Sequence, residues 1–129
     1  MKYILSLLFA IATISISAQN PYKVYCTLQG NEKELRNNQV SLSIDYGQES
    51  LKDNKLVDEN GNEIKFNTMV SAMNYMSKLG WNFEGSYNSI DQTWGGRIFI
   101  WILSKEVTSD GEITQGFQTK KMFKERHGN

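Results

Sequence analysis

The chain has only one cysteine, one histidine and one proline among its 129 residues. One cysteine cannot form a disulfide within the chain, so noncovalent contacts must hold the fold together. A zinc site needs three or four histidine or cysteine ligands. His127 lies in a polar segment, where it is not expected to orient a serine or cysteine nucleophile. We therefore predict no metal site and no catalytic residues.

An excess of charge of either sign is also absent. The 14 basic and 14 acidic residues give a formal net charge of zero, which provides no electrostatic reason to bind nucleic acid or an anionic membrane. No glycine-rich phosphate loop precedes a predicted helix, because Gly95 and Gly96 lead into a strand instead. We predict no cofactor and no nucleic-acid partner.

Long apolar runs are limited to the N-terminal segment. Lys2 precedes an apolar run over residues 4–16, and small residues follow. This pattern predicts a secretory signal peptide over residues 1–18, because the run is too short for a membrane-spanning helix. Cleavage is expected after Ala18, with Ser17 as a competing site. A buried N-terminal helix is the other interpretation.

The position of the single cysteine bears on both location and chemistry. No cysteine follows the apolar run where lipidation requires one, so we expect a secreted or periplasmic protein without a membrane anchor after cleavage. Cys26 lies instead in residues 22–30, which are rich in β-formers. Cys26, Val24 and Leu28 are alternate residues that point to the same face of a strand, which predicts that the thiol is buried. A reactive thiol or an intermolecular disulfide is the other interpretation.

Two further segments indicate β-structure. Residues 40–47 alternate between apolar and polar side chains, which predicts a strand with one wet face, paired antiparallel with residues 22–30. Asn60-Gly61 is a strong turn signal and predicts a small hairpin. The acidic residues around this turn suit either a calcium site or a solvated turn. Their spacing lacks the alternation of a helix-loop-helix calcium loop, which favours the solvated turn.

Residues 69–79 have the period of an amphipathic helix, with an N-cap at residue 67 or 68 and Gly80 beyond the C-terminus. Three methionines lie on its apolar face: Met69, Met73 and Met76. Methionine fills gaps in cores and also lines adaptable binding grooves. We expect the core role, because the chain offers few other helices to cover a sheet.

Two strands are predicted after this helix, over residues 81–87 and 97–103, and they can pair as a hairpin. Every residue from 98 to 103 is apolar, which predicts a central strand covered on both faces.

These elements predict an α+β fold: one mostly antiparallel sheet of about four to six strands with a single amphipathic helix packed on one face. The domain is expected to span residues 19–108. Residues 109–129 are polar and basic, and we expect a disordered or loosely packed tail. A short amphipathic helix using Phe117, Met122 and Phe123 is the other interpretation.

The helix and the last two strands also carry a resemblance. The sequence MNYMSKLGWNFEG, followed by an aliphatic strand, resembles small uncharacterised bacterial domains in which a helix ending L-x-x-x-G-W-E leads into a β-hairpin. An upstream YKV strand, residues 22–24 here, belongs to the same pattern, whereas Asn82 replaces the glutamate after Gly80-Trp81. The resemblance covers residues 69–103 and one strand upstream. It implies an α+β domain of one sheet and one helix, and it implies no chemistry.

The loop between the last two predicted strands holds the candidate binding residues. Tryptophan and arginine often dominate interface energies, and an exposed tryptophan can stack on a sugar or an aromatic ligand. We predict a binding site formed by Trp94, Arg97, Asp91 and Tyr87. Trp94 folded back as a lid on the sheet edge is the other interpretation.

The function that we expect is that of a small exported binding or interaction module. It would contact another exported or envelope protein through a sheet edge or the Trp94 loop, without enzymatic activity. An inhibitor or immunity-type protein that blocks a secreted partner is a special case. The alternative from another class is a small hydrolase that pairs carboxylates, with Asp45, Glu84 and Asp91 as candidates.

Overall fold

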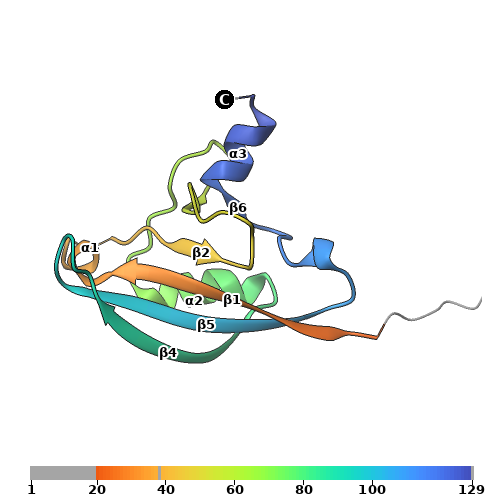
Figure 1. Ribbon diagram of the computed structural model, residues 1–129, viewed down its shortest axis with the longest axis horizontal. Helices are drawn as coiled ribbons and strands as arrows, with labels where there is room; N and C mark the ends of the chain where they lie inside the picture. Colours follow the sequence, from red (N-terminus) through yellow and green to blue (C-terminus); the bar gives the residue numbers. More distant parts are fainter. Residues whose placement is uncertain (1–19, 38, 129) are drawn as a thin grey trace, which may run out of the picture.

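The computed structural model describes residues 20–37 and 39–128, so the predicted signal peptide and its cleavage site lie outside the described residues. The larger sheet is antiparallel, with the strand order β2-β1-β5-β4 (Figure 1). Its strands are β1 (Tyr22–Asn31), β2 (Ser43–Asp45), β4 (Asn82–Ile90) and β5 (Arg97–Val107). A smaller sheet pairs β3 (Leu56–Val57) with β6 (Gln118–Thr119). The helices are α1 (Glu32–Arg36), α2 (Met69–Lys78), α3 (Lys120–Arg126) and the 3-10 helix η1 (Asp110–Glu112).

The centre of the larger sheet is the pair formed by β1 and β5. They align over their length, from Tyr22 opposite Val107 to Asn31 opposite Ile98. Strand β2 pairs with β1, and β4 pairs with β5, so both predicted antiparallel pairings are confirmed. The central position predicted for the strand that starts at Arg97 is confirmed as well.

Alternation of side chains gives the larger sheet two different faces. The core face carries the buried side chains of Cys26, Leu28 and Leu103. The opposite face, here called the solvent face, carries three isoleucines and two tyrosines: Ile98, Ile100, Ile102, Tyr25 and Tyr87. The isoleucines are half-buried, while both tyrosines are more than half exposed. The prediction that β5 is covered on both faces is therefore wrong, because its isoleucines remain partly exposed on this face.

Helix α2 forms where it was predicted because both of its ends are capped. The Ser71 N–H donates to Thr68 Oγ1 at 3.0 Å, and the Thr68 N–H donates to Ser71 Oγ at 3.2 Å. This reciprocal pair is a capping box. Leu79 is the C-cap, and Gly80 follows with φ +94°, the left-handed conformation that glycine adopts without strain.

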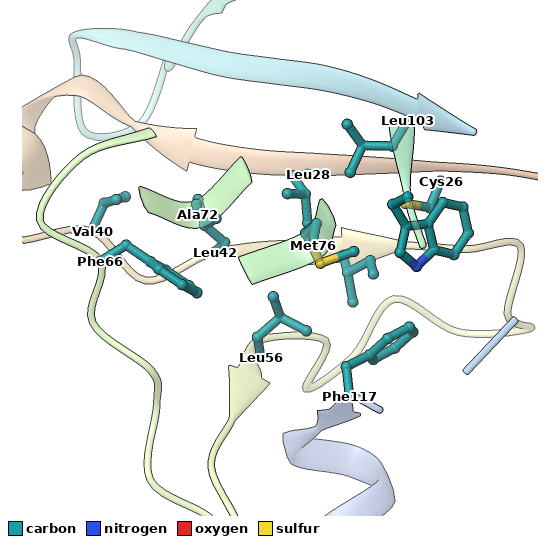
Figure 2. Close-up of a cluster of buried hydrophobic side chains, with 12 residues drawn as sticks. Cys26, Leu28, Val40, Leu42, Leu56, Phe66, Ala72, Met76, Leu103 and Phe117 are labelled. Atoms are coloured by element: carbon teal, nitrogen blue, oxygen red, sulfur yellow. The ribbon is translucent and has the colours of Figure 1, made fainter. Parts of the chain in front are cut away.

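The apolar face of α2 packs into the core. Ala72 and Met76 have no exposed surface, and Met69 and Met73 are half-buried against the same cluster. Figure 2 shows Met76 with Leu28 and other core side chains around it. The core role predicted for the methionines is confirmed.

The C-terminal segment also belongs to this core, so the prediction of a loose tail after residue 108 is wrong. Phe117 is 8% exposed and belongs to the same cluster as Leu56, and Figure 2 places it at the lower side of the cluster. Its ring meets that of Tyr46 edge to face, with 5.7 Å between the centroids. Helix α3 contains Met122 and Phe123, whereas Phe117 precedes β6.

Backbone hydrogen bonds attach this polar segment to the rest of the fold. The N–H groups of Lys120 and Lys121 donate to the carbonyls of Lys55 and Asp53, at 2.9 and 2.8 Å. Thr119 caps α3 by accepting from the Met122 N–H. The α+β class is thus correct, but the described residues contain three α-helices and a second sheet instead of one helix on one sheet.

The turn at Asn60-Gly61 forms as predicted. Asp58 Oδ1 accepts from the N–H groups of Asn60 and Asn62, at 2.9 and 3.0 Å. Gly61 has φ +83°, which glycine provides at little cost. The Asp58 carboxylate therefore acts within the turn itself.

We predict that Met76→Ala lowers the free energy of unfolding by about 2–5 kcal/mol, because it opens a cavity where α2 packs on the sheet. Urea denaturation of the purified protein measures the effect. Val70→Ala, at a position of α2 that is 63% exposed, is the control and should change stability by less than about 0.5 kcal/mol. Equal effects of the two substitutions would contradict the core assignment.

We predict that Phe117→Ala destabilises the whole domain by about 3 kcal/mol, because its ring is part of the shared core. The thermal midpoint should fall in one cooperative transition. Gln115→Ala, at an exposed position two residues earlier, should leave the midpoint nearly unchanged. An unchanged midpoint for Phe117→Ala would restore the loose-tail interpretation.

Candidate functional site

The loop that joins β4 to β5 is built around Asp91. Asp91 Oδ1 accepts from the N–H groups of Thr93 and Trp94, at 3.0 and 2.9 Å. The Asp91 N–H donates to the Gly96 carbonyl at 3.0 Å, and the Asp91 carbonyl accepts from the Gly95 N–H at 2.8 Å. Both glycines have positive φ, +73° and +80°, a conformation that favours glycine. Asp91 therefore shapes the loop.

The loop is also held from the side of α1. Asn31 Nδ2 donates to the other Asp91 oxygen at 2.9 Å, and the Lys33 ammonium donates to the Trp94 carbonyl. Figure 1 shows α1 and the β4–β5 loop together at one end of the larger sheet. The backbone of Trp94 is thus fixed from two directions.

The side chain of Trp94 is available for contact. It is 75% exposed, so the interpretation of a lid folded back on the sheet edge is wrong. Beside it lies a hollow of about 230 Å³, here called the Trp94 hollow. Its floor is formed by solvent-face side chains of β1, β2 and β5: Gln29, Asn31, Ser43 and Ile98. Its walls include Glu34, Lys55 and Trp94.

The structure separates the four predicted binding residues into two groups. Asp91 and Trp94 meet at the Trp94 hollow. Arg97 is exposed and lies outside the lining, and its backbone N–H donates to the Glu32 carboxylate at 3.2 Å. Tyr87 is 54% exposed on the solvent face and also lies outside the lining.

Strand β4 forms a free edge of the larger sheet. Within the described ranges its backbone pairs with β5 alone, and eight of its nine residues are exposed. A bulge interrupts the pairing between Phe83 and Gly85, and there the Ser104 hydroxyl donates to the Glu84 carboxylate. After the bulge, residues 85–90 contain no charged residue and no proline. This stretch is an accessible and unprotected strand edge.

A groove of about 530 Å³, here called the β4 groove, runs beside this edge on the core face. Side chains from three elements line it: Met69 and Val70 of α2, Phe99 and Trp101 of β5, and Ser86 and Asn88 of β4. Phe99 and Trp101 are half-buried. The groove therefore combines an apolar floor with a polar rim.

Sequence reasoning missed the β4 groove, although a length comparison indicates it. The ten residues of α2 span about 15 Å, whereas the eleven residues of β5 extend about 36 Å. A helix of this length cannot cover the whole strand. The parts of Phe99 and Trp101 left uncovered become the groove floor.

The three carboxylates considered for a hydrolase do not form one cluster. Asp45 lies in β2 and Glu84 in β4, the outer strands of the larger sheet. Three strand spacings separate them by about 14 Å, while paired catalytic carboxylates lie about 5–9.5 Å apart. Asp91 lies beyond the far end of β4 and acts within its loop.

Cys26 is a core residue. It is 2% exposed, and burial, with a contribution from the Asp45 charge, raises the pKa of its thiol to about 12. A thiolate is the reactive form of cysteine. The buried-thiol interpretation is therefore confirmed, and the reactive one is wrong for the folded chain.

Asp53, outside this candidate set, is engaged in an ion pair. The Lys124 ammonium donates to Asp53 Oδ2 at 2.9 Å, and this contact lowers the pKa of the Asp53 carboxyl. Across residues 20–37 and 39–128, no three histidine, cysteine, aspartate or glutamate side chains converge to hold a metal ion. No helix in these ranges has both the length and the apolar character needed to cross a bilayer.

Comparisons with known protein families, with curated proteins and with solved structures found no match. The resemblance of residues 69–103 to small bacterial domains therefore stays a prediction.

We predict that Cys26 is not alkylated by iodoacetamide at pH 8 in the folded protein, because its pKa of about 12 keeps the thiol protonated and burial blocks access. Mass spectrometry should show full labelling only after unfolding in guanidinium. Met76→Ala, which loosens the core next to it, should increase the labelling rate through more frequent opening. Rapid labelling of the native protein would contradict the assignment.

Proposed function

We propose that this protein is a small exported interaction module that binds an extended segment of another exported or envelope protein at β4. The observation that carries the proposal is the free backbone edge of β4 next to an apolar groove. Export rests on the signal peptide predicted over residues 1–18.

The free edge supports strand addition. An edge strand presents unpaired N–H and C=O groups, which a second strand can satisfy. Proteins usually protect such edges with lysine, proline or a bulge. In β4 the bulge lies near the start, and residues 85–90 have none of these features. A partner segment would have about 20 Å of strand available.

The β4 groove supports selectivity for side chains. Alternate side chains of an added strand would point toward the core-face side, where Phe99, Trp101 and Val70 form an apolar surface. Backbone pairing supplies affinity in such complexes, and side-chain pockets supply specificity. We therefore expect a partner segment with apolar residues at alternate positions.

The same geometry favours a foreign segment over a second copy of this chain. In antiparallel pairing, residues directly opposite each other share a face. Two β4 strands paired about Ser86 would bring Ser86 and Asn88 of the second copy to the groove, since these residues face that side. Small polar side chains fill an apolar groove poorly.

A peptide selection tests this proposal. We expect a random displayed peptide library to yield peptides with alternating apolar residues, and synthetic versions should bind in fluorescence polarisation. Val70→Glu places a charge in the groove wall and should weaken binding by about tenfold or more. The matched control is Ser77→Glu, at an exposed position on the same helix, which should leave the affinity unchanged.

Amide hydrogen exchange locates the bound peptide. Backbone amides within residues 85–90 should gain protection when the peptide binds. Peptides that bind without protecting β4, or a selection that yields none, would overturn the proposal. A concentration-dependent dimer with the same protection pattern would replace the foreign partner by a second copy.

A further inference from the structure

The Trp94 hollow is separate from the β4 groove. It opens on the solvent face, whereas the groove lies on the core face beside α2. Strands of the larger sheet, α1, the segment containing Lys55 and the β4–β5 loop all contribute side chains to it. Its volume of about 230 Å³ is below the roughly 300–1,000 Å³ of pockets for drug-sized ligands. It therefore suits a small ligand or one unit of a larger one.

Several side-chain donors and acceptors in the hollow can accept or donate further hydrogen bonds. Within the described part of the chain, the Gln29 amide and the Ser43 hydroxyl have no hydrogen-bond partner. Lys55 Nζ donates to the Ser41 carbonyl at 3.2 Å and keeps two further protons. Glu34 Oε2 accepts from the Ser41 N–H at 3.3 Å, and a carboxylate oxygen can accept further hydrogen bonds. This mixture of donors and acceptors suits hydroxyl groups, because each hydroxyl both donates and accepts.

The charges around the hollow disfavour an ionic ligand. The ammonium of Lys55 is opposite in sign to the carboxylates of Glu34 and Asp91. The Asp91 carboxylate already accepts hydrogen bonds within its loop. An anion would meet Glu34, and a cation would meet Lys55, so neither gains a uniform field. The nearby Lys33 ammonium is engaged with the Trp94 carbonyl. A neutral, hydroxyl-rich ligand avoids both repulsions.

An apolar platform completes the hollow. Trp94, whose side chain is exposed, and Ile98 both line it. The C–H face of a sugar ring is apolar and can pack on such an aromatic surface while its hydroxyls reach polar groups. Because Asp91 and Lys33 already fix the loop, little ordering cost remains for binding.

From these features we propose that the Trp94 hollow binds one ring of a neutral saccharide. Trp94 would stack on the ring, while Gln29, Ser43, Glu34 and Lys55 would exchange hydrogen bonds with its hydroxyls. The sugar could be free or part of a surface polysaccharide, since the recognised chemistry is the same.

An NMR titration of the full folded chain with glucose, galactose, mannose and N-acetylglucosamine tests the proposal. We expect at least one sugar to shift the Trp94 indole N–H resonance, with a dissociation constant on the order of 1 mM. Trp94→Ala should weaken binding by about tenfold, because it removes the stacking surface. The loop should persist in this variant, since its hydrogen bonds use the Trp94 backbone.

Two further variants complete the design. Tyr87→Ala removes an exposed aromatic side chain outside the hollow and should leave sugar binding unchanged, whereas Gln29→Ala should weaken it. The proposal is overturned if no sugar shifts the Trp94 resonance, or if Trp94→Ala binds as tightly as the parent. Stronger shifts with inorganic phosphate than with any sugar would also overturn it.

The source of the sugar and the independence of the two sites need separate measurements. Cosedimentation with an insoluble polysaccharide of the sugar that binds would indicate a surface polymer, and binding of the monosaccharide alone would indicate a free ligand. Peptide affinity at β4 should not change at saturating sugar. Failure of either site therefore leaves the other intact.

Discussion

The pairing of β1 with β5 is the interaction on which the rest of the structure depends. It places Cys26 opposite Leu103 and Leu28 opposite Trp101, and these side chains form the floor on which α2 packs. No disulfide reinforces it, because the single cysteine is buried in that floor. The smaller sheet and the C-terminal segment then close the other side of the same cluster through Leu56 and Phe117.

Both candidate surfaces follow from this pair of strands. At one end, Asn31 lies opposite Ile98, so α1 leaves β1 next to the loop that enters β5, and the Trp94 hollow forms between them. Along the other side, β5 is much longer than α2, so part of its core face remains open beside β4. One surface is polar and small, and the other is apolar and bordered by free backbone. They suit different ligands for that reason.

Sequence patterns correctly predicted the features that depend on residues close together in the chain. The cap at Thr68, Gly80 after α2 and the burial of Cys26 all follow from side-chain period and chemistry. The attachment of the C-terminal segment could not be read in this way, because Lys120 is held by its backbone and not by an apolar side chain. The role of Asp91 was also hidden, since an aspartate that caps a loop and one that binds a ligand look alike in sequence. The β4 groove depends on which strand forms the edge, and only the assembled sheet determines this.

The order of the strands along the chain has a kinetic consequence. Strand β1 begins to meet its main partner only when the chain has reached Ile98, and the pairing is complete only at Val107. Contacts between residues far apart in sequence form slowly, because a long loop must close first. For most of its synthesis, the growing chain therefore lacks the β1–β5 pairing and remains without its central sheet. For a chain with the signal peptide predicted over residues 1–18, this delay would keep β1 and β5 unpaired during passage through a membrane.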